Sequence, residues 1–131
     1  MFRWPIKKKL ARGRRPGVGG KPVQVAKSVV DNWIKEAKAQ GIRSVIVLLD
    51  QRQLRLYEEL RVDLISYYKL KGLRVAHIKA PNMRRPPLSD QHLKDVWIAY
   101  KRLEKPVLVH CSAGIGRTGV AARYIKKQVG S

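Results

Sequence analysis

HCSAGIGRTG, residues 110–119, is the stretch that decides the fold. It follows the apolar run Pro106–Val109, which predicts a short buried strand, and it precedes Val120–Val129, which has helical spacing. We call residues 110–119 the cysteine loop. A strand, a glycine-rich turn and a helix in this order are typical of an α/β fold.

The cysteine loop is predicted to bind an anion. A strand-to-helix turn leaves backbone N–H groups unpaired at the helix start, where the positive end of the helix dipole also lies. Glycine adopts positive φ without a steric penalty, so successive amides can turn inward around phosphoryl oxygens. We expect the phosphate to be bound by Ser112, Ala113, Gly114, Ile115, Gly116 and Arg117.

Four side chains of the loop carry the expected chemistry. A thiolate at a helix N-terminus has its pKa lowered from about 8.5 toward about 3.5 to 7.5, so Cys111 is the expected nucleophile. Arg117 is expected to hold two phosphoryl oxygens with its planar, permanently charged fork. Thr118 is expected to offer its hydroxyl to the sulfur when sulfur leaves. His110 is expected to anchor the loop through a ring hydrogen bond.

The cysteine loop resembles the Cys-x5-Arg loop of the cysteine-dependent protein tyrosine phosphatase superfamily, in the form found in tyrosine-specific and dual-specificity members. Its place near the C-terminus favours the dual-specificity type. The resemblance implies that Cys111 takes the phosphoryl group from a phosphate monoester, and that water then releases phosphate from the phosphocysteine. It implies neither a metal nor another cofactor.

Composition limits the class of protein. A chain of 131 residues with 44% hydrophobic residues predicts one domain, residues 1–131. A single cysteine and the lack of a long apolar run favour a cytoplasmic protein without integral membrane association. Because 29 basic residues face only 9 acidic ones, we expect a phosphorylated protein or another phosphate-bearing polyanion, RNA included, as the partner.

Strands and helices are expected to alternate along the chain. We predict strands at Phe2–Ile6, Ile42–Leu49 and Leu73–Ile78. We predict helices from Val25 to the C-cap Gly41, from Leu54 as far as Gly72, and from the N-cap Ser89 to Glu104. Lys7–Lys21 is expected to be a loop whose arginines form an unspecific basic surface. These elements predict a mostly parallel central sheet flanked by helices, with Cys111 at the carboxyl end of a strand, where such sheets bind ligands.

One element of the resemblance is missing. The superfamily pattern places an aspartate, the acid that protonates the leaving group, about thirty residues before the cysteine, and this chain has Asn82 at that position. We call residues 80–87 the proline-rich loop. Asparagine cannot donate a proton, so the acid could be Asp90 or Asp50. Arg84 and Arg85 are candidates for contacts with further substrate phosphates.

Asn82 is also compatible with two different functions. The leaving group could need little protonation, as in an RNA 5′-triphosphatase or a polyphosphate phosphatase, and the basic charge also leaves a phosphoinositide phosphatase open. The chain could instead be an acid-deficient module that binds phosphate without turnover. The leading hypothesis is a phosphatase for phosphotyrosine, and for phosphoserine or phosphothreonine.

Overall fold

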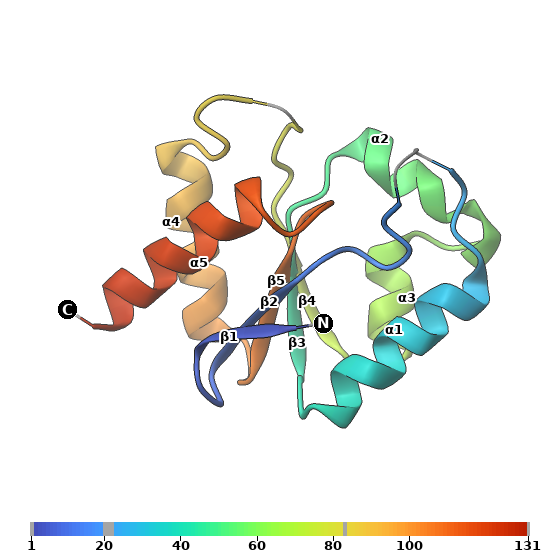
Figure 1. Ribbon diagram of the computed structural model, residues 1–131, viewed down its shortest axis with the longest axis horizontal. Helices are drawn as coiled ribbons and strands as arrows, with labels where there is room; N and C mark the ends of the chain where they lie inside the picture. The colour runs from blue at the N-terminus through green and yellow to red at the C-terminus, as the bar shows by residue number, and fades with distance from the viewer. Residues whose placement is uncertain (1, 20–22, 83, 131) are drawn as a thin grey trace.

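The computed structural model describes residues 2–19, 23–82 and 84–130, and these build a five-stranded sheet. The strand order is β1-β2-β5-β3-β4, and only β1 and β2 are antiparallel (Figure 1). The strands are β1 (Arg3–Ile6), β2 (Leu10–Gly13), β3 (Ser44–Val47), β4 (Arg74–His77) and β5 (Val107–His110). The predicted α/β fold with a mostly parallel sheet is confirmed.

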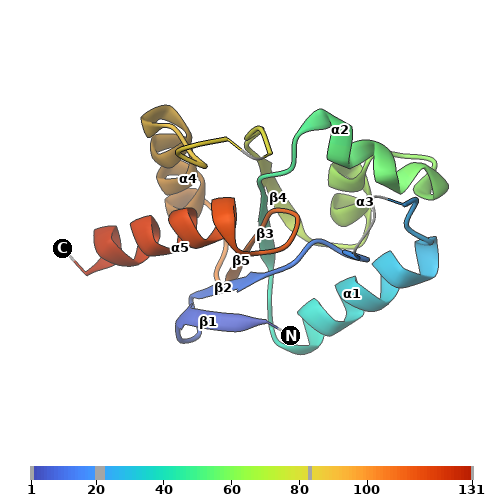
Figure 2. The same ribbon diagram turned by 45° about the horizontal axis from the view of Figure 1, so that its top comes forward.

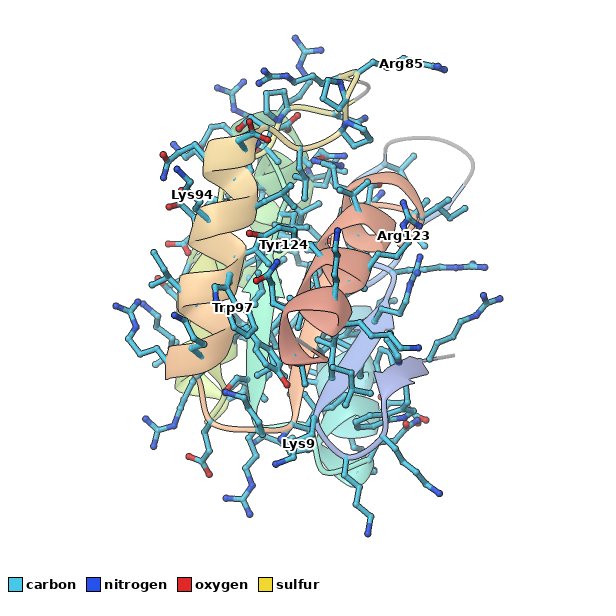
Figure 3. All side chains as sticks on the ribbon, turned by 90° about the vertical axis from the view of Figure 1, so that its left-hand side faces the viewer. Lys9, Arg85, Lys94, Trp97, Arg123 and Tyr124 are labelled. Atoms are coloured by element: carbon cyan, nitrogen blue, oxygen red, sulfur yellow. The ribbon has the colours of Figure 1, made fainter. Side chains whose placement is uncertain are left out.

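Helices cover both faces of this sheet. They are α1 (Lys27–Ala39), α2 (Gln51–Leu54), the 3-10 helix η1 (Arg55–Leu60), α3 (Leu64–Leu70), α4 (Asp90–Arg102) and α5 (Gly116–Val129). Figures 1 and 2 show α1 and α3 on one face, and α4 and α5 on the other. Trp97 of α4 and Tyr124 of α5 lie on the sides of these helices that face each other (Figure 3).

The central strands β3 and β5 send alternate side chains to the two faces, as the two-residue period of a strand requires. Val45 and Leu108 join the apolar cluster beneath α1 and α3, whereas Ile46 and Val109 join the cluster beneath α4 and α5. All four side chains are fully buried. The same alternation continues beyond β5, so His110 and Cys111 leave the strand toward opposite faces.

The prediction of a loop over Lys7–Lys21 is wrong for its first part, because β2 lies there. The turn that joins β1 to β2 contains three lysines and places Lys8 at a φ of 65°, without the glycine or asparagine that normally signals such a turn. β2 is only four residues long. The strand therefore leaves no pattern that local sequence could reveal. Residues 20 and 21 of the expected loop lie outside the described residues.

The helix predicted from Leu54 as far as Gly72 is interrupted. Arg61 adopts a left-handed φ of 63°, and α3 begins again after Asp63. The Asp63 side chain accepts the Ser66 backbone N–H at 2.8 Å, so this aspartate is the N-cap of a new helix. The capping signal is present in the sequence, but it is hidden inside a run with helical spacing.

The remaining predicted elements are confirmed with different bounds. The strands at Ile42–Leu49 and Leu73–Ile78 shorten to β3 and β4, and Ser89 is the N-cap of α4. Helix α5 begins at Gly116, so its first turn belongs to the cysteine loop. Within the described ranges, no helix combines the length and the apolar character needed to cross a bilayer.

Candidate active site

The cysteine loop leaves the carboxyl end of the central strand β5 and enters α5. Gly114 has a φ of 79°, and a Cβ on this residue would lie 2.6 Å from the carbonyl oxygen of Gly13. A side chain is therefore excluded by both the backbone conformation and the close approach of β2. Beyond β2, the Arg15 backbone N–H donates to the Ser112 carbonyl at 3.0 Å, so the end of this strand holds the loop in place.

Cys111 is 3% exposed at the base of the loop. Burial is the largest single influence on its thiol, and burial raises the pKa. The opposing influences together are stronger: the hydroxyl and amide of Thr118, the positive charge of Arg117, and the amide of Gly114. The net pKa of Cys111 lies below its ordinary value of 9.0, in the direction that favours the thiolate.

Thr118 is the strongest of these stabilising neighbours. Its Oγ1 is buried and makes no hydrogen bond of standard geometry with any described residue. The hydroxyl proton is therefore free to point at the sulfur, and this interaction lowers the pKa of Cys111. A buried hydroxyl without another partner is costly unless it serves such a role.

Arg117 extends from the first turn of α5 across the carboxyl ends of the neighbouring strands, and it is 4% exposed. One terminal nitrogen donates to the carbonyl oxygens of Leu48 at 2.9 Å and Ala80 at 2.7 Å. The other donates to Asn82 Oδ1 at 3.2 Å. Burial lowers the pKa of Arg117, while the charges of Cys111 and Asp50 raise it. The guanidinium is thus fixed beside the sulfur.

His110 lies fully buried on the opposite face of the sheet, where it meets the stacked rings of Trp33 and Tyr68 edge to face. Its Nδ1 lies 3.0 Å from the Cys111 carbonyl oxygen, and its Nε2 lies 2.9 Å from the Tyr68 hydroxyl. Because a carbonyl oxygen can only accept, Nδ1 carries the proton and Nε2 accepts from Tyr68. Burial lowers the pKa of His110 to about 4. The predicted ring hydrogen bond is present, and it is made by a neutral histidine.

Two arginines that the sequence placed on an unspecific surface contact the loop instead. Arg15 is 4% exposed, and its Nε donates to Ser112 Oγ at 3.1 Å while Nη1 donates to the Tyr57 hydroxyl at 3.2 Å. Arg12 Nη2 donates to the Gly114 carbonyl at 2.8 Å. Both contacts join residues about one hundred positions apart, and they depend on the unpredicted strand β2, which contains Arg12 and ends two residues before Arg15, so no local signal could have identified them.

The candidate acids differ in their contacts with Arg117 and the proline-rich loop. Asn82 donates its backbone N–H to Asp50 Oδ2 at 3.2 Å, and its own Oδ1 accepts from Arg117. Asp50 is also the N-cap of α2, where Oδ1 accepts the Gln53 N–H. Asp90 begins α4 and makes no hydrogen bond or ion pair with Cys111, Arg117 or Asn82. Of the two predicted substitutes, Asp50 is therefore the one that contacts the proline-rich loop.

The remaining polar candidates contribute less to this center. Arg84 and Arg85 are exposed, and Figure 3 shows Arg85 extending outward from the proline-rich loop. Met83 of the same loop lies outside the described residues. In the part of the chain that the structure describes, no three His, Cys, Asp or Glu side chains form a group suited to a metal ion.

Comparisons with known proteins place this arrangement among phosphatases. Residues 18–128 match the family model Tc-R-P, described as a polymorphic toxin system DSP-PTPase phosphatase. A stretch of 79 residues, 56% of this chain, is 37% identical to tyrosine-protein phosphatase non-receptor type 20 of Rattus norvegicus. The chain spans only 19% of that protein.

Two solved structures have a similar fold. One is kinase associated phosphatase (KAP) with its catalytic-site cysteine replaced by serine, at a TM-score of 0.67 and 20% identity, covering 92% of this chain and 65% of the other. The second is the core catalytic domain of the PP-IP phosphatase SIW14 from S. cerevisiae in complex with citrate, at a TM-score of 0.58 and 16% identity. That match covers 93% of this chain and 62% of the other.

Proposed function

Because this chain belongs to the Tc-R-P family of DSP-PTPase phosphatases, we propose that it hydrolyses phosphate monoesters through a phosphocysteine intermediate. The observation that carries the proposal is the surroundings of Cys111: a buried thiol whose pKa is lowered by Thr118, Arg117 and the Gly114 amide. The family description also supports a polymorphic toxin system as the setting of this activity.

In the first step, the Cys111 thiolate attacks phosphorus, a sulfur–phosphorus bond forms, and the bond from phosphorus to the leaving oxygen breaks. Arg117 exchanges its hydrogen bond with Asn82 for phosphoryl oxygens, and the loop amides stabilise the developing charge. In the second step, water attacks phosphorus and the sulfur leaves as a thiolate. The Thr118 hydroxyl, which has no other partner among the described residues, then donates to that thiolate.

Phosphotyrosine is the substrate class that we propose first. Asn82 occupies the acid position and cannot protonate a leaving oxygen, so a phenolate leaves more readily than the alkoxide of serine or threonine. Asp50 is the substitute acid that we favour over Asp90, because Asp50 contacts the proline-rich loop. The single cysteine, which must stay reduced, supports a cytoplasmic site of action.

The direct test is hydrolysis of p-nitrophenyl phosphate by the wild type and by Cys111→Ser. We expect the serine variant to lose turnover while it still binds vanadate or phosphate. Equal turnover by the two proteins would contradict the mechanism. A wild type that forms phosphocysteine only once, without steady turnover, would indicate the acid-deficient phosphate-binding module instead.

Asn82→Asp tests the position of the acid. Restoring a carboxylic acid should increase turnover of alkyl phosphoesters by about a hundredfold, and it should change activated aryl esters little. The same increase for both substrate types would mean that Asn82 does not face the leaving group. Asp50→Asn should lower alkyl ester turnover in the wild type, whereas Asp90→Asn is the matched control.

A second candidate function follows from the same missing acid. An RNA 5′-triphosphate or a polyphosphate has a leaving group that is already acidic, and such a reaction does not require Asn82 to be an aspartate. Release of the γ-phosphate from triphosphate-ended RNA, compared with phosphopeptide hydrolysis at equal protein concentration, separates this function from the first.

A further inference from the structure

The charge of this chain is distributed unevenly around the candidate site. Residues 1–26 and 105–131 together contain thirteen Lys and Arg residues and no Asp or Glu. These two segments form β1, β2, β5, the cysteine loop and α5, and Figure 2 shows β1 and β2 beside the start of α5. One side of the loop therefore has a positive field that no acidic residue of these elements neutralises.

Three arginines on this side lie unusually close together. Arg3 and Arg12 are direct partners across the antiparallel pair of β1 and β2, so their side chains leave the same face. Arg12 Nη2 and Arg123 Nη1 each lie 3.3 Å from the position that a Cβ on Gly119 would take, and are thus at most about 6.6 Å apart, twice that distance. Arg123 lies on the side of α5 away from Tyr124 (Figure 3).

This cluster has no anionic partner among residues 2–19, 23–82 and 84–130. Among the described residues, the ion pairs involve Asp31 and Glu104, and neither contacts Arg3, Arg12 or Arg123. Like charges at such distances repel one another, and an external anion between them would relieve the repulsion. The arrangement is therefore suited to an anion that arrives with a ligand.

A cavity of about 910 Å³ lies between two arginines of the cluster, Arg3 and Arg12, and the cysteine loop, while Arg123 lies outside its lining. Arg3, Arg12 and Arg14 line it, and its rim is formed by residues 113–115 of the loop. Arg12 also donates to the Gly114 carbonyl at 2.8 Å. Three peptide steps of 3.8 Å place the Cα of Gly114 within about 11 Å of the Cα of Cys111. The cavity thus adjoins the phosphoryl site. We call it the arginine cavity.

The aromatic residues of the arginine cavity do not form a platform for nucleic-acid bases. Trp33 is 9% exposed, its Nε1 donates to the Arg14 carbonyl, and its ring meets Phe2 edge to face with centroids 5.5 Å apart. Base stacking needs an open ring face, which a buried ring cannot offer. The cavity therefore recognises charge rather than bases.

We propose that the arginine cavity is a second anion subsite, and that it binds another phosphate of the molecule whose phosphoester Cys111 attacks. This inference rests on the proposed function and adds a substrate class to it: molecules that carry a second phosphate close enough to the attacked one to reach the arginine cavity beside residues 113–115. Exposed Arg3 and Arg14 bind that phosphate, and Arg12 links the cavity to the loop.

Binding to the Cys111→Ser protein tests the subsite without depending on turnover. The probes are a peptide with phosphotyrosine and a phosphoserine two residues away, and the same peptide with phosphotyrosine alone. We expect the doubly phosphorylated peptide to bind at least about tenfold more tightly, since a charge-assisted contact has that magnitude. A second comparison measures the binding of inositol hexakisphosphate and of orthophosphate to the same protein. A preference in this comparison alone would indicate that the second phosphate belongs to a small molecule, and a preference in the peptide comparison alone would indicate that it belongs to a protein.

Arg3→Gln combined with Arg14→Gln should abolish the tighter binding of the multiply phosphorylated probe, in whichever of the two comparisons shows it. Binding of the probe with a single phosphate should stay the same. Lys94→Gln combined with Arg102→Gln removes the same charge from α4 and should keep the preference. Arg123→Gln on exposed α5 gives an independent variant and should weaken the preference by several-fold.

Three results would overturn the proposal. One is equal binding of singly and multiply phosphorylated probes in both comparisons. Another is an equal loss of binding preference in the Arg3→Gln/Arg14→Gln variant and in the Lys94→Gln/Arg102→Gln control, which would show only a general effect of charge. The third is tighter binding of a single-stranded RNA than of either phosphorylated probe, with the loss at the same arginines. Absence of p-nitrophenyl phosphate turnover in the wild type would refute the proposed function alone, because the binding measurements do not use turnover.

Discussion

Acidification should destabilise the protein through His110. The folded-state pKa of His110 is lowered from 6.5 to about 4, mainly by burial, with smaller lowering by the charges of Arg15, Arg117 and His77. Below the ordinary pKa the unfolded chain binds a proton that the folded chain does not accept. Stability from this residue is therefore fully present above about pH 6.5 and is lost as the pH falls toward about 4.

The size of the loss follows from the two pKa values. Each pH unit in this window removes about 1.4 kcal/mol, so the free energy of unfolding should fall by about 3 kcal/mol between about pH 7.5 and about pH 4. That is a large part of the stability of a typical domain. The protonated ring would also lose its acceptor role toward the Tyr68 hydroxyl at 2.9 Å. The Nδ1–H that anchors the cysteine loop to the Cys111 carbonyl is kept in the protonated ring, so the loss comes from the buried charge and from the Tyr68 contact.

Urea unfolding at several pH values in this window measures the effect, with His110→Gln as the variant that cannot titrate. The carboxylates of Asp31, Asp63 and Glu104 have lowered pKa values, so the stability that they contribute to the fold is also lost in acid. Because the wild type and the variant both contain these carboxylates, their effect cancels in the comparison. The difference between the two proteins isolates His110. A wild type and a His110→Gln variant with parallel pH profiles would refute the reasoning. If His110→Gln does not fold, Tyr68→Phe should show a shallower profile than the wild type.

Three further substitutions test the construction of the loop. Thr118→Val should raise the pKa of Cys111 and slow hydrolysis of the phosphocysteine, because the hydroxyl is the strongest group that lowers this pKa; unchanged alkylation and burst kinetics would contradict that role. Arg15→Met should lower kcat/KM for p-nitrophenyl phosphate by about tenfold through loss of the bond to Ser112, and Tyr57→Phe, which keeps that bond, should lower it less. Gly114→Ala should reduce the free energy of unfolding by about 2 kcal/mol. Gly116→Ala is the control and should change this free energy little, because a Cβ there would meet nothing within 4 Å. Equal shifts of the melting temperature in the two variants would argue against the close approach of Gly13.

The sequence predicted the parts of the site that are encoded locally. Cys111, Arg117 and Thr118 lie within eight positions of one another, and the backbone pattern of a strand, a glycine-rich turn and a helix positions all three. The predicted ring hydrogen bond of His110 is also present. Its partner Tyr68 lies 42 positions away and could not be named before the topology was known.

The parts that sequence could not predict depend on contacts between distant segments. Arg15 reaches Ser112 over 97 positions, and Arg12 reaches Gly114 over 102 positions, through the short strand β2. A strand so short, entered through a turn of lysines, has neither the length nor the turn residues that distinguish strand from loop. The contact of Asn82 with Arg117 also depends on how β4 and β5 lie in the sheet.

The pH dependence of Cys111 alkylation by iodoacetamide tests most directly whether this cysteine is held as a thiolate. Cys111 is the only cysteine of the chain, so the rate of modification reports on it alone. We predict a midpoint below the ordinary pKa of 9.0, with protection by vanadate. A midpoint at the ordinary value, with no effect of vanadate, would contradict the central claim that the loop binds phosphate beside an ionised sulfur.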